Sequence, residues 1–163
     1  MRFDQNDLKR FRQGEHFHCY TMLGARKEEL DGKSGYFFAV WAPMAKSVCV
    51  TGEFDGWSGS GFFMEPEGNS GIWKTFVPGA AEGMLYKYRI ETQSGEILYK
   101  ADPFAFSAEK RPGTASRLAE LSYEWKDGQW MQERKSGSHF EKPLNIYEVH
   151  LGSWKQHGKK PED

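Results

Sequence analysis

Short apolar and alternating runs, separated by Gly and Pro, follow one another between residues 36 and 103. The clearest is MLYKYRIET, in which Tyr86 and Tyr88 fall on one face of an extended chain and Lys87 on the other. A turn at Ser94-Gly95 leads into EILYKADP, and the two runs together predict a β-hairpin. Three earlier runs read YFFAVWAP, KSVCVTGEF and GIWKTFVPG. Short strands at this spacing, without long helical patterns between them, predict an all-β antiparallel sandwich.

The segments on either side of these runs are more polar. Residues 6–14 predict a short N-terminal helix, with Asn6 or Asp7 as its cap and Gly14 in the left-handed conformation at its end. Residues 16–35 form a polar lead-in that ends in turn residues. Residues 121–143 are polar around isolated tryptophans, which indicates a linker or an irregular connector. Residues 144–154 read LNIYEVHLGSW and predict a strand without an obvious partner, as at the start of a second domain.

Composition narrows the class of protein. The formal net charge is −1, and Lys and Arg are scattered, so the chain has no basic face of the kind that nucleic acid requires. The polar N-terminal sequence gives no secretory signal, and no apolar run is long enough for a membrane span. The two cysteines give no disulfide framework, so free thiols and a cytoplasmic location are expected. Aromatic residues make up 15% of the chain, which suits short strands and a surface for ring-shaped ligands.

Two clusters of chemically active residues are weak candidates for a site. His16, His18 and Cys19 are close in sequence, but no second cluster completes a tetrahedral metal site, so no metal is predicted. Glu148 and His150 fall on one side of the predicted C-terminal strand, but no third partner is identifiable for acid–base chemistry. The sequence has no nucleotide-binding or hydrolase fingerprint, so neither a cofactor nor a self-contained catalytic site is predicted.

The sequence GEFDGW offers a better candidate, for binding. Asp55-Gly56 is a turn signal, which predicts that Trp57 projects from a loop. A flat indole can cover the apolar face of a sugar ring while nearby donors bind its hydroxyl groups. Lys87, on the polar side of its strand, is a suitable donor. Two interpretations of Trp57 remain open at this point: a platform for a glucan, or a partly buried core residue.

Three blocks of the sequence, in this order, resemble bacterial-type glycogen branching enzymes: FAVWAPMAKSVCVTGEFDGW, then a block running from GIWKTFVPG through KADPFAF to RPGTAS, then LNIYEVHLGSWK. The first two resemble the family 48 carbohydrate-binding module, which also occurs in the β subunit of the AMP-activated kinase. The third resembles the first barrel strand of the α-amylase superfamily. The resemblance implies an immunoglobulin-like sandwich at residues 35–120, after an N-terminal segment at 1–34. A linker at 121–143 and the start of a catalytic (β/α)8 barrel at 144–163 would follow.

The resemblance also implies five glucan contacts. Trp57 and Lys87 match the tryptophan and lysine of the module's binding motif. The kinase module has a second tryptophan just before an Asp-Pro pair; the sequence here is LYKADP, so Tyr99 is the nearest aromatic residue. Thr114 and Ser116 match later polar positions, with Ser116 in place of Asn.

The implied function is binding of α-1,4-glucan within a branching enzyme of glycogen biosynthesis, with the catalytic barrel of the same protein as a partner. Such enzymes perform a retaining glycosyl transfer with an Asp nucleophile and a Glu acid/base on later barrel strands. This chain alone is therefore expected to be inactive. Two alternatives stay open: a module from a debranching or trehalose-forming relative, and a docking domain that does not bind glucan.

Overall fold

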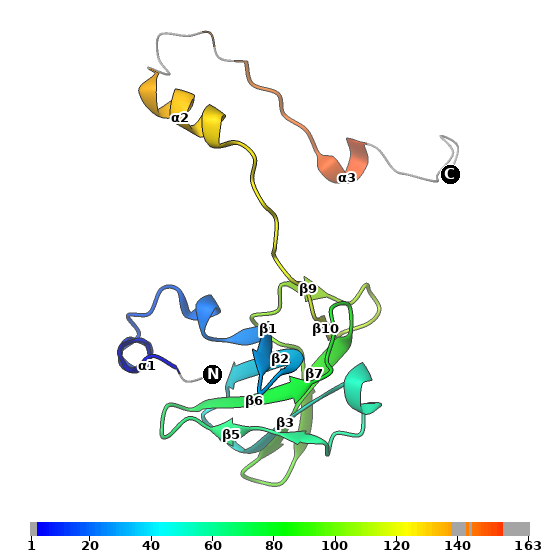
Figure 1. Cartoon of the computed structure of the whole chain (residues 1–163). Helices are drawn as coiled ribbons and strands as arrows, with labels where there is room; N and C mark the ends of the chain where they lie inside the picture. Colours follow the sequence, from blue (N-terminus) through cyan, green and yellow to red (C-terminus); the bar gives the residue numbers. More distant parts are fainter. Residues whose placement is uncertain (1–2, 138–142, 144, 155–163) are drawn as a thin grey trace, which may run out of the picture. The chain divides into compact units, whose positions relative to one another are not determined.

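The computed structural model describes residues 3–137, 143 and 145–154, which fall into two compact units, Met1–Ser122 and Tyr123–Asp163. Each unit is considered by itself. The first unit is built mainly of short strands (Figure 1). Its elements are α1 (Gln5–Arg12), η1 (Cys19–Thr21), β1 (Gly24–Leu30), β2 (Lys33–Trp41), β3 (Ala45–Gly52), η2 (Glu53–Asp55), β4 (Phe62–Phe63), β5 (Glu65–Pro66), β6 (Ile72–Pro78), β7 (Leu85–Thr92), β8 (Ile97–Lys100), β9 (Ser107–Ala108) and β10 (Ser116–Arg117).

These strands form two antiparallel sheets. The first has the order β1-β2-β6-β5, and the second has the order β4-β3-β7-β10-β9, with β8 pairing alongside β7. Tyr88 pairs with Lys100 and Glu91 with Ile97, which confirms the predicted hairpin. Gly95 at its turn has a φ of 86°, a conformation that glycine adopts without a steric cost. The all-β, immunoglobulin-like sandwich predicted from the sequence is confirmed.

The main core lies between the two sheets. Tyr36, Phe38 and Val40 point into it from β2, and Tyr86 and Tyr88 point into it from β7. The alternation that predicted the two faces of β7 is therefore confirmed. Fully burying a side chain of this size contributes about 2–3 kcal/mol, so these rings hold the sheets together.

A second core covers the outer face of the first sheet. Helix α1 packs there through Leu8, over Phe37 and Ala39, the residues of β2 that point away from the main core. Strand β2 is thus buried on both faces, which is why its sequence is a continuous apolar run and does not alternate. The helix begins after Asp4, whose carboxylate accepts the Asn6 N–H at 2.8 Å. The predicted cap at Asn6 or Asp7 was wrong by two or three residues.

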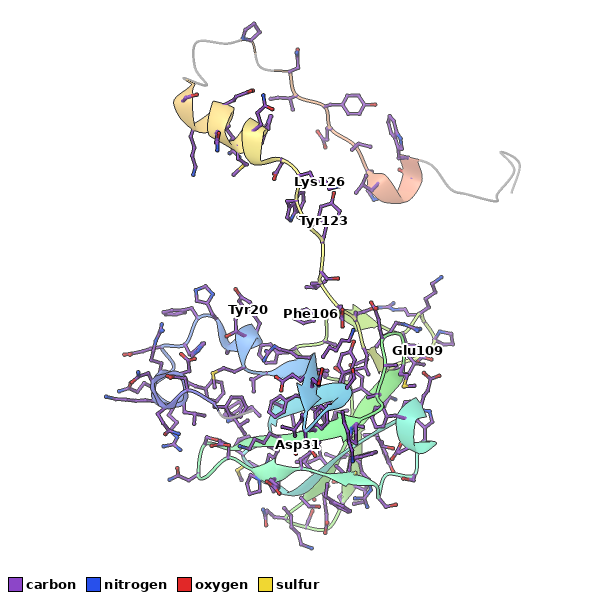
Figure 2. All side chains as sticks on the ribbon, viewed as in Figure 1. Tyr20, Asp31, Phe106, Glu109, Tyr123 and Lys126 are labelled. Atoms are coloured by element: carbon purple, nitrogen blue, oxygen red, sulfur yellow. The ribbon has the colours of Figure 1, made fainter. Side chains whose placement is uncertain are left out.

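Strand β1 was not predicted, because residues 16–35 were interpreted as a polar lead-in. Its sequence, GARKEEL, is charged because β1 is an edge strand, paired among the described strands with β2 alone. The turn between β1 and β2 is formed by Asp31 and Gly32, with φ of 51° and 72°; Asp31 is labelled in Figure 2. Asp-Gly with two positive φ values is a preferred two-residue hairpin turn. The sandwich therefore begins at Gly24.

The second unit holds two short helices, α2 (Gly128–Ser136) and α3 (Leu151–Trp154). Helix α2 lies within the segment that was predicted to be an irregular connector. Residues 145–150 have no regular structure, so the strand predicted there is wrong; Ile146 is 84% exposed. A strand needs hydrogen-bonded neighbours, and no described residue pairs with this segment.

Tyr123 and Lys126 project from an extended stretch (Figure 2). No helix in the described part of the chain is long and apolar enough to cross a membrane.

Candidate functional site

Four strands of the second sheet bring a row of side chains to its outer face. The cross-strand pairs Phe63–Cys49, Cys49–Arg89 and Arg89–Tyr99 run across β4, β3, β7 and β8. Paired residues of antiparallel strands point to the same face, so this face carries Phe63, Arg89 and Tyr99. Phe63 is 55% exposed and Tyr99 is 53% exposed, whereas Cys49 beneath them is fully buried. The next row pairs Thr51 with Lys87, so Lys87 lies on this face as well.

The loop that follows β3 presents Trp57 at this end of the sheet. The 3-10 turn η2 ends at Asp55 and is capped by Gly56, which has a φ of 62°, and Trp57 itself has a φ of 62°. A left-handed conformation is uncommon for a bulky residue, and here it turns the chain abruptly after η2. Trp57 is 42% exposed, in agreement with the prediction that it projects from a loop.

Asp55 holds this loop in place. Its carboxylate accepts hydrogen bonds from the Gly52 N–H at 2.8 Å and from the Trp57 N–H at 3.1 Å. The hydroxyl groups of Ser58 and Thr51 also donate to it, at 2.9 Å and 3.0 Å. Burial raises the pKa of this carboxyl, but the four donors outweigh burial and bring its pKa below the usual range. Asp55 is therefore ionised at neutral pH and is a structural anchor for the Trp57 loop.

Gly59 joins the loop to the sheet. It has a φ of 65°, and a Cβ atom placed on it would lie 3.0 Å from the Arg89 Cδ and 3.3 Å from the Tyr99 Oη. The loop therefore lies against Arg89 and Tyr99 at Gly59, two residues after Trp57.

Two polar residues complete this surface. The Lys87 ammonium donates a hydrogen bond to the Thr114 hydroxyl at 2.7 Å, and Thr114 is exposed. The structure thus brings together four of the five residues predicted as glucan contacts: Trp57, Lys87, Tyr99 and Thr114. We call these four residues, with Arg89 and Phe63, the aromatic face.

Ser116, the fifth predicted residue, is not part of this face. It pairs with Tyr86, so it points into the sandwich, and it is only 2% exposed. Its hydroxyl accepts the Asp102 N–H at 2.8 Å. Thr114 and Ser116 are two residues apart, but the chain enters β10 between them, and the inward-facing position of the strand excludes Ser116 from a surface contact.

Ser116 belongs to a buried polar cluster around Asp102. One carboxylate oxygen of Asp102 accepts the Tyr86 hydroxyl at 2.6 Å and the Tyr88 hydroxyl at 3.1 Å, and the other accepts the Phe104 N–H at 2.8 Å. Burial raises the pKa of Asp102, although these hydrogen bonds oppose the shift. Burial also raises the pKa of both tyrosines. The cluster has no exposed member and fixes the end of the core.

Sequence reasoning missed Arg89 and Phe63. The alternation of β7 placed Arg89 on the same side as Lys87, so the signal was present for that residue. Phe63 lies in the two-residue strand β4, which is too short to give a periodic pattern.

The weak candidates are dispersed in the structure. His16 is buried with its Nε2 3.2 Å from an Asp7 oxygen, whereas the His18 Nδ1 lies 3.1 Å from the Tyr20 hydroxyl. Among the described residues no three His, Cys, Asp or Glu side chains are grouped as metal ligands. His150 is exposed, and its Nδ1 is 2.9 Å from the Ser153 hydroxyl.

Comparison with known proteins identifies the family to which the chain belongs. The family profile of carbohydrate-binding module 48, described as the isoamylase N-terminal domain, matches residues 22–105. This match covers more than half of the chain, and the chain belongs to that family. A similar solved structure is that of a pullulanase from Paenibacillus barengoltzii complexed with maltotetraose, with a TM-score of 0.50 and 25% identity, over 61% of this chain and 15% of that one.

Curated relatives give a narrower likeness. The chain is 47% identical to the 1,4-α-glucan branching enzyme GlgB of Bacillus subtilis over 153 residues, which are 93% of this chain and 24% of that protein. It is also 47% identical to GlgB of Rhodopirellula baltica over 93% of this chain and 21% of that protein. The chain thus spans about a quarter of the length of the relatives that it matches.

Proposed function

We propose that this chain binds α-1,4-glucan through the aromatic face, as the carbohydrate-binding module of a 1,4-α-glucan branching enzyme. The observation that carries the proposal is that Tyr99, Lys87 and Arg89 share one sheet face and that the loop carrying the exposed Trp57 lies against that face at Gly59. Sugar rings stack on aromatic side chains through their apolar C–H faces, while charged donors bind their hydroxyl groups. The similarity to two branching enzymes and the family assignment support the choice of ligand.

The aromatic face is suited to binding a glucan and not to catalysing glycosyl transfer. A retaining glycosyl transfer needs two carboxyl groups about 5 Å apart on either side of the scissile bond. Asp55, the carboxylate next to Trp57, uses both oxygens to hold its own loop. We therefore assign the transfer reaction to a catalytic barrel of the same protein, with this module as its glucan-binding partner.

Calorimetric titration with maltoheptaose tests the binding site. Trp57→Ala removes a stacking platform worth about 1–2 kcal/mol, so the affinity should fall about tenfold. Lys87→Ala removes one donor and should weaken binding by about 0.5–1.5 kcal/mol. Trp130→Ala is a matched control, because Trp130 is 57% exposed but lies in the second unit. Its affinity for maltoheptaose should equal that of the unsubstituted chain.

The rival function is a docking domain that does not bind glucan. On that view the aromatic face would be covered by another part of the protein. Either maltoheptaose would not bind the unsubstituted chain at all, or Trp57→Ala would bind it with unchanged affinity.

A second rival is a module of a debranching enzyme, which the likeness to the pullulanase structure favours. Its lower identity, 25% against 47%, makes it the weaker candidate. The sequence of the catalytic barrel encoded with this module distinguishes the two enzymes.

A further inference from the structure

A cleft of about 670 Å³ opens on the first sheet, on the opposite side of the sandwich from the aromatic face. The end of α1, the end of β2 and the turn between β5 and β6 form its walls. Its apolar lining includes Phe11, Trp41, Pro43 and Phe104. Trp41 pairs with Ile72, which lies under α1, so the indole belongs to the outer face of this sheet.

The indole of Trp41 is held in position but remains accessible. Its ring packs edge-on against Phe11, with centroids 6.1 Å apart and an interplanar angle of 81°. Gly71 lies close to the indole nitrogen: a Cβ on Gly71 would be 2.9 Å from the Trp41 Nε1 and 2.8 Å from the Pro43 Cβ. Gly71 has a φ of 78°, so glycine is required here both by the backbone and by the close approach. Trp41 is nevertheless 54% exposed.

Two polar side chains line the rim of the cleft. Arg12 extends from the last turn of α1 toward the turn at Gly68, and Asn69 lies on that turn. Among the residues that the structure describes, neither side chain has a hydrogen-bond or ion-pair partner, and both are exposed. Among the described residues that line the cleft, Arg12 alone is charged, and the Arg12 and Asn69 side chains can both donate hydrogen bonds to the hydroxyl groups of a ligand.

We propose that this cleft is a second carbohydrate subsite, in which a glucose ring of an α-glucan stacks on Trp41 while Arg12 and Asn69 bind its hydroxyl groups. The choice of ligand rests on the proposed function; the site itself rests on the cleft. An aromatic wall that is fixed before the ligand arrives and donors without internal partners are the combination expected of a small-ligand pocket. The subsite is separate from the aromatic face, because the two lie on the outer sides of different sheets.

Nuclear magnetic resonance of the tryptophan indole N–H groups tests the proposal in the 163-residue chain. The sequence has six tryptophans, so single Trp→Phe variants assign every signal. On titration with maltotriose the Trp41 signal should shift with its own dissociation constant, distinct from that of Trp57. In the Trp57→Ala variant the Trp41 titration should persist with an unchanged constant.

Arg12→Ala should weaken the Trp41 titration about fivefold and leave the Trp57 titration unaltered, because a hydrogen bond from a charged donor is lost. Lys9→Ala is the matched control: it removes the same charge from the same last turn of α1, outside the cleft. A Trp41 signal that stays fixed while Trp57 saturates overturns the second subsite alone. A Trp41 shift that disappears in the Trp57→Ala variant also overturns the second subsite alone. If neither signal moves, the proposed function fails as well.

Discussion

Asp55→Ala should damage glucan binding without removing any atom that touches the sugar. The substitution deletes the acceptor for four donors, two of them backbone N–H groups. Gly52 and Thr51 are both buried, so their donors are left without a partner. A hydrogen bond to a charged group contributes about 1.5–3 kcal/mol, and solvent reaches part of this loop, so we expect a total loss of about 2–4 kcal/mol. In a unit of this size that lowers Tm by roughly 10 °C.

Asp55→Asn is the informative comparison. An amide oxygen can still accept the Gly52 and Trp57 N–H groups, and the amide NH2 can donate to the Ser58 and Thr51 hydroxyls. We expect its Tm to be near that of the unsubstituted chain at neutral pH and its maltoheptaose affinity to be within about twofold. Asp55→Ala should lose affinity as strongly as Trp57→Ala, measured by calorimetry at a temperature where the variant is folded. An Asp55→Ala variant with normal Tm or normal affinity would refute the assigned role.

The pH dependence gives an independent check on the same residue. The folded-state pKa of Asp55 lies below its ordinary value of 3.8, so the stability that its charge supplies is complete above that value. This stability is lost as the pH falls from 3.8 through the folded-state pKa. The Tm of the unsubstituted chain should therefore keep a constant offset from that of Asp55→Asn near neutral pH and fall relative to it in acid. A Tm of the unsubstituted chain that rises relative to that of Asp55→Asn on acidification would contradict the direction of the pKa shift.

Three further outcomes are expected. Asp102→Ala leaves the buried hydroxyls of Tyr86 and Tyr88 without their acceptor and should cost about 3 kcal/mol in a thermal or urea melt; a neutral result would show that the cluster is not structural. Gly59→Ala should cost about 1–2 kcal/mol, because alanine adopts the left-handed conformation poorly, and the same melt would expose an error if stability rose. In hydrogen exchange, amides of residues 145–150 should exchange far faster than those of β7, and strong protection there would contradict their exposure.

The fold could be predicted from the sequence where a strand has one buried and one polar face, as in β7, or two buried faces, as in β2. The prediction failed where solvent, and not the core, determines composition. Strand β1 is charged because it is an edge, and the helix α2 has no buried residue to give it an apolar stripe. The strand predicted around Ile146 failed for the opposite reason. Its residues are apolar, but local composition cannot supply the neighbouring strands that a parallel strand requires.

The aromatic face was predictable in part. A turn signal placed Trp57 on a loop and alternation placed Lys87 on an outer face, both from local physics. Tyr99 and Thr114 were reached only through resemblance, since neither carries a local signal. Ser116 was misplaced because resemblance aligns positions along the chain, whereas pairing with Tyr86 determines which side of the sheet a residue faces.

The left-handed backbone of Trp57 sets binding and stability against each other at one position. A non-glycine residue at a φ of 62° carries a cost of about 1–2 kcal/mol that glycine would avoid. Trp57→Gly should consequently be more stable than Trp57→Ala by about 1 kcal/mol, although both lack the ring. Selection of random variants for heat resistance alone would therefore favour glycine over other small residues at position 57. Only a screen that also selects for glucan binding would keep tryptophan at position 57.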